Sequence, residues 1–330
     1  LDKVKNTYIG QFLREINDDN KIHPFFDLHT VQTYRSASSR PNFQNIPVRD
    51  KQAKKYARSG ILPSPGNIIF DFDYKAMEVR VCASISQDPV LMKYIEEDHD
   101  MHMEEACNIY GLPPKRVSKD LRHFSKNGFV FPEIYGSYYV NCAKNIWKGC
   151  EEGKLMTTDG QDIFDHLLSE GIIKTRSDIT SFENHLREVE TNFWEKYEGV
   201  KQWQESVIER YIKDGVLELA TGFSCRGYLS RNNLCNYPIQ GPAFHCLLYS
   251  IIHLSDFLLE EGMKAKMIAQ IHDNLIFDCP PEERDHLQKK CIYIATQKIR
   301  EDWKWIKVPL SLEFSTTEVN QSWDSKKDIE

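Results

Sequence analysis

Residues 67–73 read N-I-I-F-D-F-D and directly follow Pro65-Gly66. This run is short, β-branched and aromatic, which predicts a buried strand, with a helix at residues 74–86 after it. A second signal lies at residues 264–279, K-A-K-M-I-A-Q-I-H-D-N-L-I-F-D-C, where two apolar runs flank a polar centre. That pattern predicts a β-hairpin with acidic chemistry at its tip.

The rest of the chain is predicted to be mostly helical. Residues 88–212 have helical periodicity, clearest at 182–212, and contain a glycine-rich surface loop at 149–162. A further helix is expected at 242–261 and ended by Gly262, another begins near residue 280, and a last strand is expected at 308–314. This order predicts an antiparallel α+β core with a mostly helical lobe inserted in its middle.

Composition excludes several classes of protein. The 330 residues are 41% hydrophobic and 28% charged, with a net charge of −7. A generic cationic nucleic-acid coat is therefore excluded, whereas a nucleic-acid enzyme with a local basic track is not. No apolar run approaches the roughly 20 residues of a membrane span, so no membrane partner is expected. Nine cysteines without C-x-x-C spacing argue against a zinc ribbon and predict reduced thiols in a cytoplasmic setting.

Two acidic positions stand out at the edges of the predicted strands. Asp71 and Asp73 point to one strand face, because side chains alternate along a strand, and Asp273 lies at the hairpin tip. Carboxylates from two distant strands could hold two Mg²⁺ ions about 3.5–4 Å apart for phosphoryl transfer. The alternative is that they are turn-forming or capping acids. Spacing alone leaves both interpretations open and favours the second.

The strings around these acids carry a resemblance. Residues 73–80 read D-Y-K-A-M-E-V-R and residues 270–274 read Q-I-H-D-N, while R-S-A-S-S-R-P-N-F-Q-N-I-P-V-R occupies 35–49, D-M-H occupies 100–102 and N-Y-P-I-Q-G occupies 236–241. In this order they resemble the motifs of the family A DNA polymerases, the group that includes bacterial DNA polymerase I. The motifs span almost the whole chain and are highly specific in combination.

The resemblance implies roles for the acids. Asp73 and Asp273 would be catalytic and would ligate two Mg²⁺ ions, with Mn²⁺ able to substitute. The motif D-Y-x-x-x-E-x-R selects Asp73 rather than Asp71, which is left as either a supporting acid or a simple surface residue. Asn274 stands where the family usually has an acid, which removes one negative charge near the metals but keeps a carbonyl oxygen.

Residues 122–136 resemble the family's nucleotide-binding helix. Arg122 and Lys126 share one helical face suited to a triphosphate, and Lys126 would protonate the leaving pyrophosphate; without the resemblance, a solvated basic face is the simpler interpretation. The spacing from Lys126 to Tyr135 is one residue longer than the family's. This makes Phe131 the expected base-stacking residue, with Phe129 as the alternative, and together with Pro132 predicts a bent or bulged helix.

The remaining residues complete the implied site. Glu78 resembles the steric gate that, with Tyr135, excludes a ribose 2′-hydroxyl, and His102 resembles a triphosphate contact. The positions expected to touch primer and template are Arg35, Asn42, Gln44, Asn236, Gln240 and His272, whose donors can check base-pair geometry without reading sequence. A basic cluster of either phosphate-binding or solubilising function comprises Arg49, Lys51, Lys54, Lys55 and Arg58.

The fold implied is a right-hand polymerase palm at 1–86 and 213–330, with inserted fingers at 87–212. The thumb and exonuclease are expected to be absent and supplied by an upstream segment or a second subunit. The implied function is template-directed DNA synthesis from dNTPs on primer–template DNA, in the cytoplasm, or the host cytoplasm for a phage branch. One alternative is a catalytically weak nucleic-acid-binding subunit. The other is a single-subunit RNA polymerase, and Glu78 and the string at 236–241 argue against that one.

Overall fold

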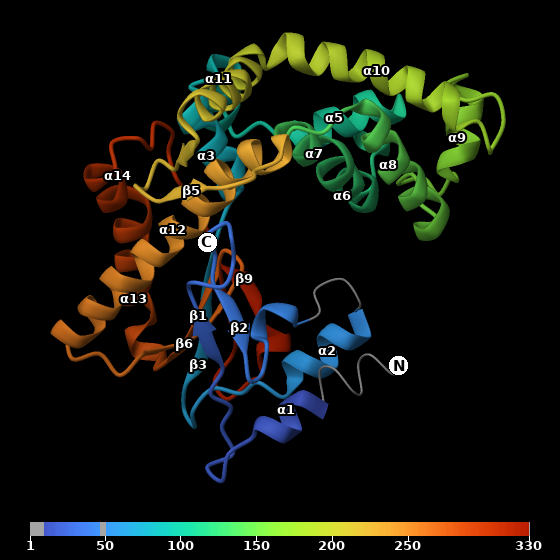
Figure 1. The fold of residues 1–330 in the computed structure, drawn as a ribbon. Helices are drawn as coiled ribbons and strands as arrows, with labels where there is room; N and C mark the ends of the chain where they lie inside the picture. Colours follow the sequence, from blue (N-terminus) through green and yellow to red (C-terminus); the bar gives the residue numbers. More distant parts are fainter. Residues whose placement is uncertain (1–9, 47–50, 330) are drawn as a thin grey trace. The chain divides into compact units, whose positions relative to one another are not determined.

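The computed structural model describes residues 10–46 and 51–329, which form two compact units. Unit 1 comprises Leu1–Val81 and Gln240–Glu330, and unit 2 comprises Cys82–Ile239. The two boundaries fall inside helix α3 (Met77–Ser86) and helix α12 (Arg231–Glu260). Figure 1 follows the chain through both units by colour.

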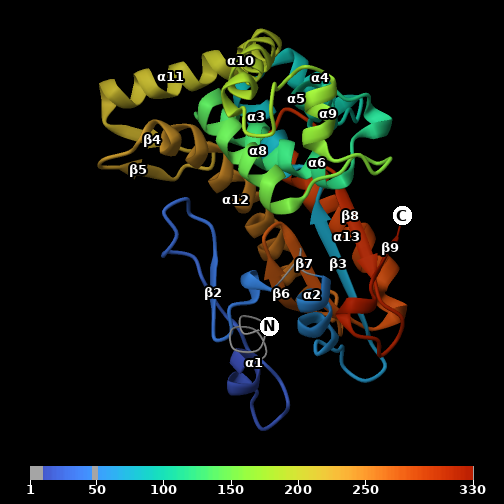
Figure 2. The ribbon, with the colours of Figure 1, turned by 90° about the vertical axis from the view of Figure 1, so that its right-hand side faces the viewer.

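Unit 1 is built on a five-stranded sheet whose strand order is β6-β7-β3-β8-β9. Every neighbouring pair is antiparallel. The strands are β3 (Ile68–Tyr74), β6 (Lys266–Ile271), β7 (Asn274–Cys279), β8 (Leu312–Thr316) and β9 (Lys327–Ile329). Strands β6, β7 and β3 lie side by side in Figure 2. The sheet confirms the predicted antiparallel α+β core, although the last predicted strand begins and ends later than 308–314.

One face of the sheet is aromatic. Phe70 and Phe72 of β3 meet Phe277 of β7 and Phe314 of β8, with ring centroids 5.6 to 6.3 Å apart. On the same face, the Tyr74 hydroxyl lies 2.9 Å from the Ser250 hydroxyl of α12. Helix α12 therefore covers this face, and the alternation predicted from the sequence holds along the whole of β3.

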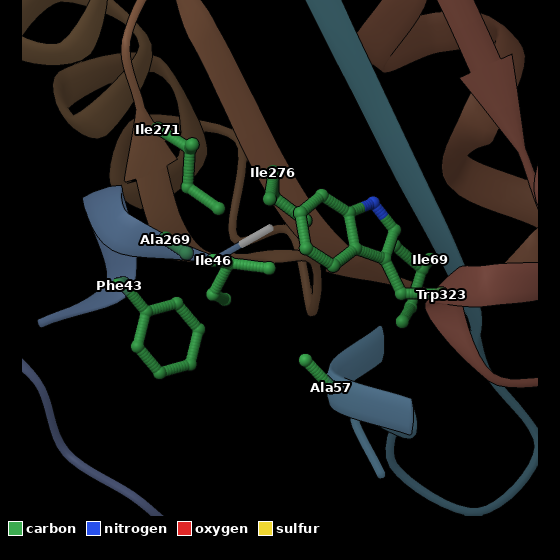
Figure 3. Packing of buried hydrophobic residues seen from close by; sticks show 8 residues of the cluster. All are labelled: Phe43, Ile46, Ala57, Ile69, Ala269, Ile271, Ile276 and Trp323. Carbon is green, nitrogen blue, oxygen red and sulfur yellow. The ribbon is translucent and has the colours of Figure 1, made fainter. Parts of the chain in front are cut away.

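The opposite face carries an aliphatic cluster and, beside it, the acids. Ile69 and Ile276 of this face pack with Trp323 from the C-terminal segment and with residues of β6, helix α2 (Lys51–Ser59) and the 43–46 turn, as Figure 3 shows. Because Asp71 and Asp73 follow Ile69 at intervals of two, both acids project from this face. One strand thus builds the hydrophobic core and presents the acids at its end.

Helix α12 is longer than the predicted 242–261 because it begins at Arg231 and runs through Pro238. By length and composition it is a candidate membrane span, with a mean hydropathy of 1.3 over 18 residues, but 61% of that window is buried inside the protein. This degree of burial is that of a core helix of the protein. Gly262 ends it as predicted, with φ at +63°.

The other elements of unit 1 are short. They are α1 (Gly10–Glu15), β1 (Phe25–Asp27), β2 (Ala37–Ser39), the 3₁₀ turn η2 (Phe43–Asn45), α2 (Lys51–Ser59), η5 (Pro281–Glu283), α13 (Arg284–Ile292), the π-helix η6 (Tyr293–Lys298), α14 (Ile299–Asp302) and η7 (Trp323–Ser325). The helix predicted to begin near residue 280 is present as η5 and α13.

Unit 2 is helical, as predicted, apart from a small hairpin. Its elements are α4 (Pro89–Glu96), α5 (Met101–Tyr110), η3 (Pro114–Arg116), α6 (Lys119–Ser125), the π-helix η4 (Lys126–Val130), α7 (Phe131–Ile134), α8 (Tyr139–Gly153), α9 (Ile163–Ser169), α10 (Ile179–Lys196), α11 (Glu198–Asp214), β4 (Val216–Glu218) and β5 (Ser224–Arg226). The helical region 182–212 is divided at Tyr197, whose backbone leaves helical geometry. The loop predicted from residue 149 begins only after α8 ends at Gly153.

Candidate active site

The two acids of the sequence motifs meet at one end of the β3–β7 strand pair. Asp73 on β3 lies directly opposite Asn274, the first residue of β7. Asp273 precedes Asn274 in the two-residue turn between β6 and β7, and its carbonyl accepts a hydrogen bond of 3.3 Å from the amide of Tyr74. The hairpin pairing thus brings together two carboxylates that are far apart in the sequence.

The electrostatics of Asp73 report this proximity. Burial, followed by the negative charge of Asp273, raises the pKa of Asp73 to about 7, while Lys326 acts in the opposite direction. The Asp73 residue as a whole is exposed to solvent. Protein atoms nevertheless surround its carboxylate closely, so burial is the largest cause of its raised pKa. A carboxylate whose pKa is raised in this way by a neighbouring carboxylate would be stabilised by a cation between the two.

The donor set fits Mg²⁺. Asp73 and Asp273 offer carboxylate oxygens, and Oδ1 of the adjacent Asn274 is buried and has no hydrogen-bond partner. No group of three His, Cys, Asp or Glu side chains suited to a metal occurs in residues 10–46 and 51–329. Mg²⁺ does not require one, because it is commonly held by one or two carboxylates, with water and substrate phosphates completing the shell.

The turn that carries Asp273 is held by a chain of side-chain hydrogen bonds. Gln270 donates from Nε2 to the backbone carbonyl of His272. The Oε1 atom of Gln270 accepts from Ser36 Oγ at 2.6 Å and from Gln44 Nε2 at 3.1 Å. His272 itself has φ of +54°, a conformation that side chains adopt at a cost. Gln44, expected at the DNA, therefore braces the turn in this structure.

Glu78 lies in the first turn of α3, just beyond the end of β3. Its Oε1 is 3.9 Å from Nη1 of Arg35, another residue predicted to touch DNA. His272 also interacts with these two charges. Burial and then the positive charge of Arg35 lower the pKa of His272, whereas the negative charge of Glu78 raises it. The motif's Arg80 serves the backbone: its guanidinium donates to the carbonyls of Lys75 and Pro309, which fixes the strand-to-helix connection.

Asp71 is not a surface residue. It is 1% exposed, pairs with Lys326 at 2.9 Å and accepts from Trp323 Nε1 at 3.0 Å. Arg58 lies 4.0 Å above the Trp323 ring, so this member of the predicted basic cluster is a packing residue here. In the same cluster, Arg49 and the side chain of Lys51 lie outside the described residues.

In unit 2, Arg122 and Lys126 lie at the junction of α6 and η4. The π-helix η4 accommodates one extra residue in the turn, which is the usual origin of a π-bulge. This explains the surplus residue between Lys126 and Tyr135. Pro132 is the second residue of α7, and the backbone stays helical from η4 through Val130 and Phe131, so its missing N–H falls inside a continuous helical run directly after the π-turn. Of the bent or bulged helix predicted from spacing and proline, the bulge is present as this π-turn.

The π-helix decides which aromatic residue is available. Phe131 is half-buried and stacks on Tyr135, and the Nζ atom of Lys126 lies 5.2 Å from its ring. Phe129 is fully buried and packs edge-on against Phe193 of α10. Of the two alternatives left by the sequence, only Phe131 is placed with Lys126 and Tyr135.

His102 lies against the same group, 5.5 Å from the Phe131 ring. Burial, with the charges of Lys126 and Arg122, lowers its pKa to about 3, and its Nδ1 has no partner in the described part of the chain. Arg122 is engaged by Asp100 through two hydrogen bonds of 2.6 and 2.9 Å. Although burial opposes it, the hydrogen bond from Arg122 lowers the pKa of Asp100.

Three further residues predicted to contact DNA are Asn236, Gln240 and Asn42. Asn236 and Gln240 are four residues apart in α12 and so share one helix face. The Oδ1 atom of Asn236 is buried and has no hydrogen-bond partner among the residues described. Asn42 caps η2 by accepting from the amide of Asn45 at 3.2 Å.

The chain belongs to DNA polymerase family A, whose family model matches residues 1–159 and 174–325. DNA polymerase I of Lactococcus lactis subsp. lactis strain IL1403 is 29% identical over 329 residues, which cover 96% of this chain and 33% of the relative. DNA polymerase I of Bacillus subtilis strain 168 is 28% identical over 341 residues, 99% of this chain and 34% of the relative. The chain therefore spans about a third of the length of these curated relatives.

A solved structure shares the fold. It is the POL domain of Pol1 from M. smegmatis in complex with DNA primer-template and dNTP, which matches 98% of this chain and 51% of its own with a TM-score of 0.73. At 21% sequence identity, this likeness shows the fold alone. Together with the family match, it confirms the predicted polymerase fold and the resemblance found in the sequence.

Proposed function

We propose that this chain catalyses template-directed DNA synthesis, adding dNTPs to a primer 3′-hydroxyl with release of pyrophosphate. The observation that carries the proposal is the carboxylate pair Asp73 and Asp273 at one end of the β3–β7 pair, with the pKa of Asp73 raised by burial and by its partner. In a member of this family, such a pair is the expected holder of catalytic metal ions.

Asp73 and Asp273 would hold two Mg²⁺ ions, for which Mn²⁺ can substitute. When bound, these ions supply positive charge beside the attacking and leaving oxygens of an in-line displacement. The protein's own part is geometric: the hydrogen bond from Tyr74 to the Asp273 carbonyl and the Gln270 brace fix the turn before substrate arrives. Preorganisation of this kind lowers the reorganisation needed in the transition state.

Unit 2 supplies the groups for the nucleotide. Arg122 and Lys126 would bind the triphosphate, and Lys126 would give a proton to the leaving pyrophosphate. Phe131 would stack on the incoming base, and Tyr135 would support Phe131. In unit 1, Glu78 would exclude a ribose 2′-hydroxyl. Burial and the charges of Lys126 and Arg122 lower the pKa of His102 and favour its neutral form, which would contact phosphate as a hydrogen-bond donor.

The DNA contacts follow the same assignment. Arg35, Asn42, Gln44, Asn236, Gln240 and His272 would lie along primer and template near the nascent pair. We propose that unit 1 acts as the palm and unit 2 as the fingers of a cytoplasmic polymerase, and that a further duplex-gripping segment, on this or another chain, completes the enzyme. We also propose that this chain belongs to a phage branch of the family.

A binding-only role is the second candidate, favoured by two observations. Asn274 gives the site one carboxylate fewer than the family usually has, and Arg122 is paired with Asp100 rather than open to phosphate. Primer extension and DNA affinity of Asp273→Asn, measured together, separate the two. Synthesis predicts loss of Mg²⁺-dependent extension with DNA affinity unchanged within about twofold, because a metal ligand contributes to chemistry more than to duplex binding. Extension equal in variant and unsubstituted protein would contradict it.

A further inference from the structure

Asp71 receives hydrogen bonds from several segments of unit 1. Besides Lys326 and Trp323, it accepts from Ser315 Oγ on β8 and from Asn274 Nδ2 on β7, each at 3.2 Å. Lys326 Nζ lies 2.9 Å from both carboxylate oxygens. Lys326 and Trp323 can only donate hydrogen bonds, so the carboxylate between them acts as an acceptor.

This determines which way the Asn274 amide faces. Nitrogen and oxygen of an amide are assigned from their hydrogen-bond partners, and here an acceptor-only carboxylate requires the NH₂ group. The amide oxygen of Asn274 is therefore the atom turned away from Asp71. It is buried, in a residue 8% exposed, and has no partner in the described part of the chain.

A buried oxygen without a hydrogen-bond partner is costly, so a ligand that bonds to it would relieve that cost. Asn274 lies directly opposite Asp73 and follows Asp273 in the chain, so the three oxygen-bearing residues are neighbours at one end of the strand pair. Carbonyl and carboxylate oxygens are the ligands that divalent cations such as Mg²⁺ accept.

We propose that Oδ1 of Asn274 is a further ligand of the cation held by Asp73 and Asp273, and that Asp71 is a positioning residue that fixes the orientation of this amide. The inference rests on the proposed function, since it assumes that the acid pair binds metal. Lys326 balances the negative charge of Asp71, so the net negative charge of the proposed cation site comes from Asp73 and Asp273. The neutral amide of Asn274 adds an oxygen ligand without adding charge.

Mn²⁺ binding to the full chain, followed by the electron paramagnetic resonance of free Mn²⁺, tests the ligand. Asn274→Leu keeps the side-chain volume and removes the oxygen, and we expect its Mn²⁺ affinity to fall at least about tenfold. Circular dichroism melting checks that the variant is folded. Affinity equal to that of the unsubstituted chain would overturn the proposal.

A charge-neutral double variant tests the positioning role. Asp71→Leu with Lys326→Met removes one negative and one positive charge, and buried ion pairs are often replaced by apolar residues without loss of stability. If Asp71 acted only through its charge, this variant would bind Mn²⁺ as the unsubstituted chain does, which would overturn the positioning role. We expect about a tenfold loss, with no further loss when Asn274→Leu is added, as for residues acting through one another.

A rescue variant provides a second readout, because the two oxygens of a carboxylate are equivalent, unlike the oxygen and nitrogen of an amide. A carboxylate presents oxygen whichever way it turns but also adds negative charge, so Asn274→Asp is introduced both into the unsubstituted chain and into the double variant. Mn²⁺ affinity should rise more in the double variant if amide orientation is what was lost; an equal rise in both counts against the proposal. Asp273→Asn separates the premise from the inference. Unchanged Mn²⁺ binding in that variant would defeat the proposed function, whereas loss there with none in Asn274→Leu would defeat only the role of Asn274.

Discussion

The rings of Phe131 and Tyr135 lie parallel within 6°, with their centroids 5.6 Å apart. This stack leaves Phe131 half-buried, whereas Phe129, two residues earlier, is enclosed against Phe193. The π-turn between Lys126 and Val130 produces this difference, because it advances the residues that follow by one position around the helix.

Phe131→Ala is expected to raise the KM for dNTPs by about tenfold or more, since stacking of a base on an aromatic ring contributes roughly 1–3 kcal/mol. Phe129→Leu is the matched control. It should lower the free energy of unfolding by roughly 1 kcal/mol through imperfect packing and leave KM unchanged. Steady-state kinetics and urea unfolding of both variants measure these effects. A raised KM in Phe129→Leu together with an unchanged KM in Phe131→Ala would instead identify Phe129 as the stacking residue.

Glu78 is predicted to exclude ribonucleotides by its bulk. Glu78→Ala should raise kcat/KM for ribonucleotides at least about tenfold, comparable to the removal of one or more methylenes of steric exclusion. Glu78→Gln keeps the bulk but loses the charge that faces Arg35 at 3.9 Å. We expect it to retain sugar discrimination in single-nucleotide incorporation assays. Equal loss of discrimination in both variants would assign selectivity to the ion pair instead.

Gln44 is predicted to act through the Asp273 turn. Gln44→Ala removes a donor to both Ser36 and Gln270, which holds the carbonyl of His272. We expect kcat to fall about tenfold, as for loss of a supporting contact to a metal ligand, with DNA affinity changed by less than about twofold. Single-turnover incorporation and fluorescence anisotropy on labelled duplex measure the two quantities. Weakened DNA binding with normal kcat would show instead that Gln44 contacts DNA directly.

Glu133 should make stability depend on pH. Burial, followed by the charge of Glu190, raises its pKa to about 8, whereas an unfolded Glu titrates near about 4.3. Between these values the folded protein binds more protons than the unfolded chain, so the free energy of unfolding falls as pH rises. Trp194 Nε1 donates to this carboxyl at 3.1 Å, a contact that Gln can keep.

Glu133→Gln should therefore be more stable than the unsubstituted protein at pH 8, by roughly 1–3 kcal/mol, and about equal to it at pH 5. Urea unfolding at pH 5, 6.5 and 8 measures the difference. Glu188→Gln, an exposed position on α10, is the control and should change stability by less than about 0.5 kcal/mol at every pH. A constant offset for Glu133→Gln across this range would show that its carboxyl does not titrate there.

Local patterns were enough to predict strand β3, the β6–β7 hairpin and the acids at their ends. Alternation along residues 68–74 separates the aromatic from the acidic face, and the polar tip of the hairpin interrupts two apolar runs. The surplus residue before Tyr135 and Pro132 predicted a distorted helix. They could not specify a π-turn, because its formation depends on packing against neighbouring helices, where Gly128 closely approaches Ile146.

The environment of Asp71 could not be predicted. Its partners Trp323 and Lys326 lie in the C-terminal segment, and no local pattern links them to β3. The start of α12 at Arg231 was missed for a related reason: Pro238 argues against a helix, but tertiary packing of the following apolar turns outweighs that local cost. In both cases, contacts remote in sequence decide the outcome.

The most direct test of the central claim is Mg²⁺-dependent extension of a labelled recessed primer by this chain with dNTPs. Asp73→Asn is compared with Asp278→Asn, a control on β7 whose carboxylate accepts hydrogen bonds from Ser64 and Asn67. The account predicts extension by the unsubstituted chain and the control, and a loss of at least about a hundredfold in Asp73→Asn, since a ligand of the catalytic metal is removed. Extension by Asp73→Asn at the control's rate would contradict it, as would no extension by the unsubstituted chain when the proposed duplex-gripping segment is also supplied.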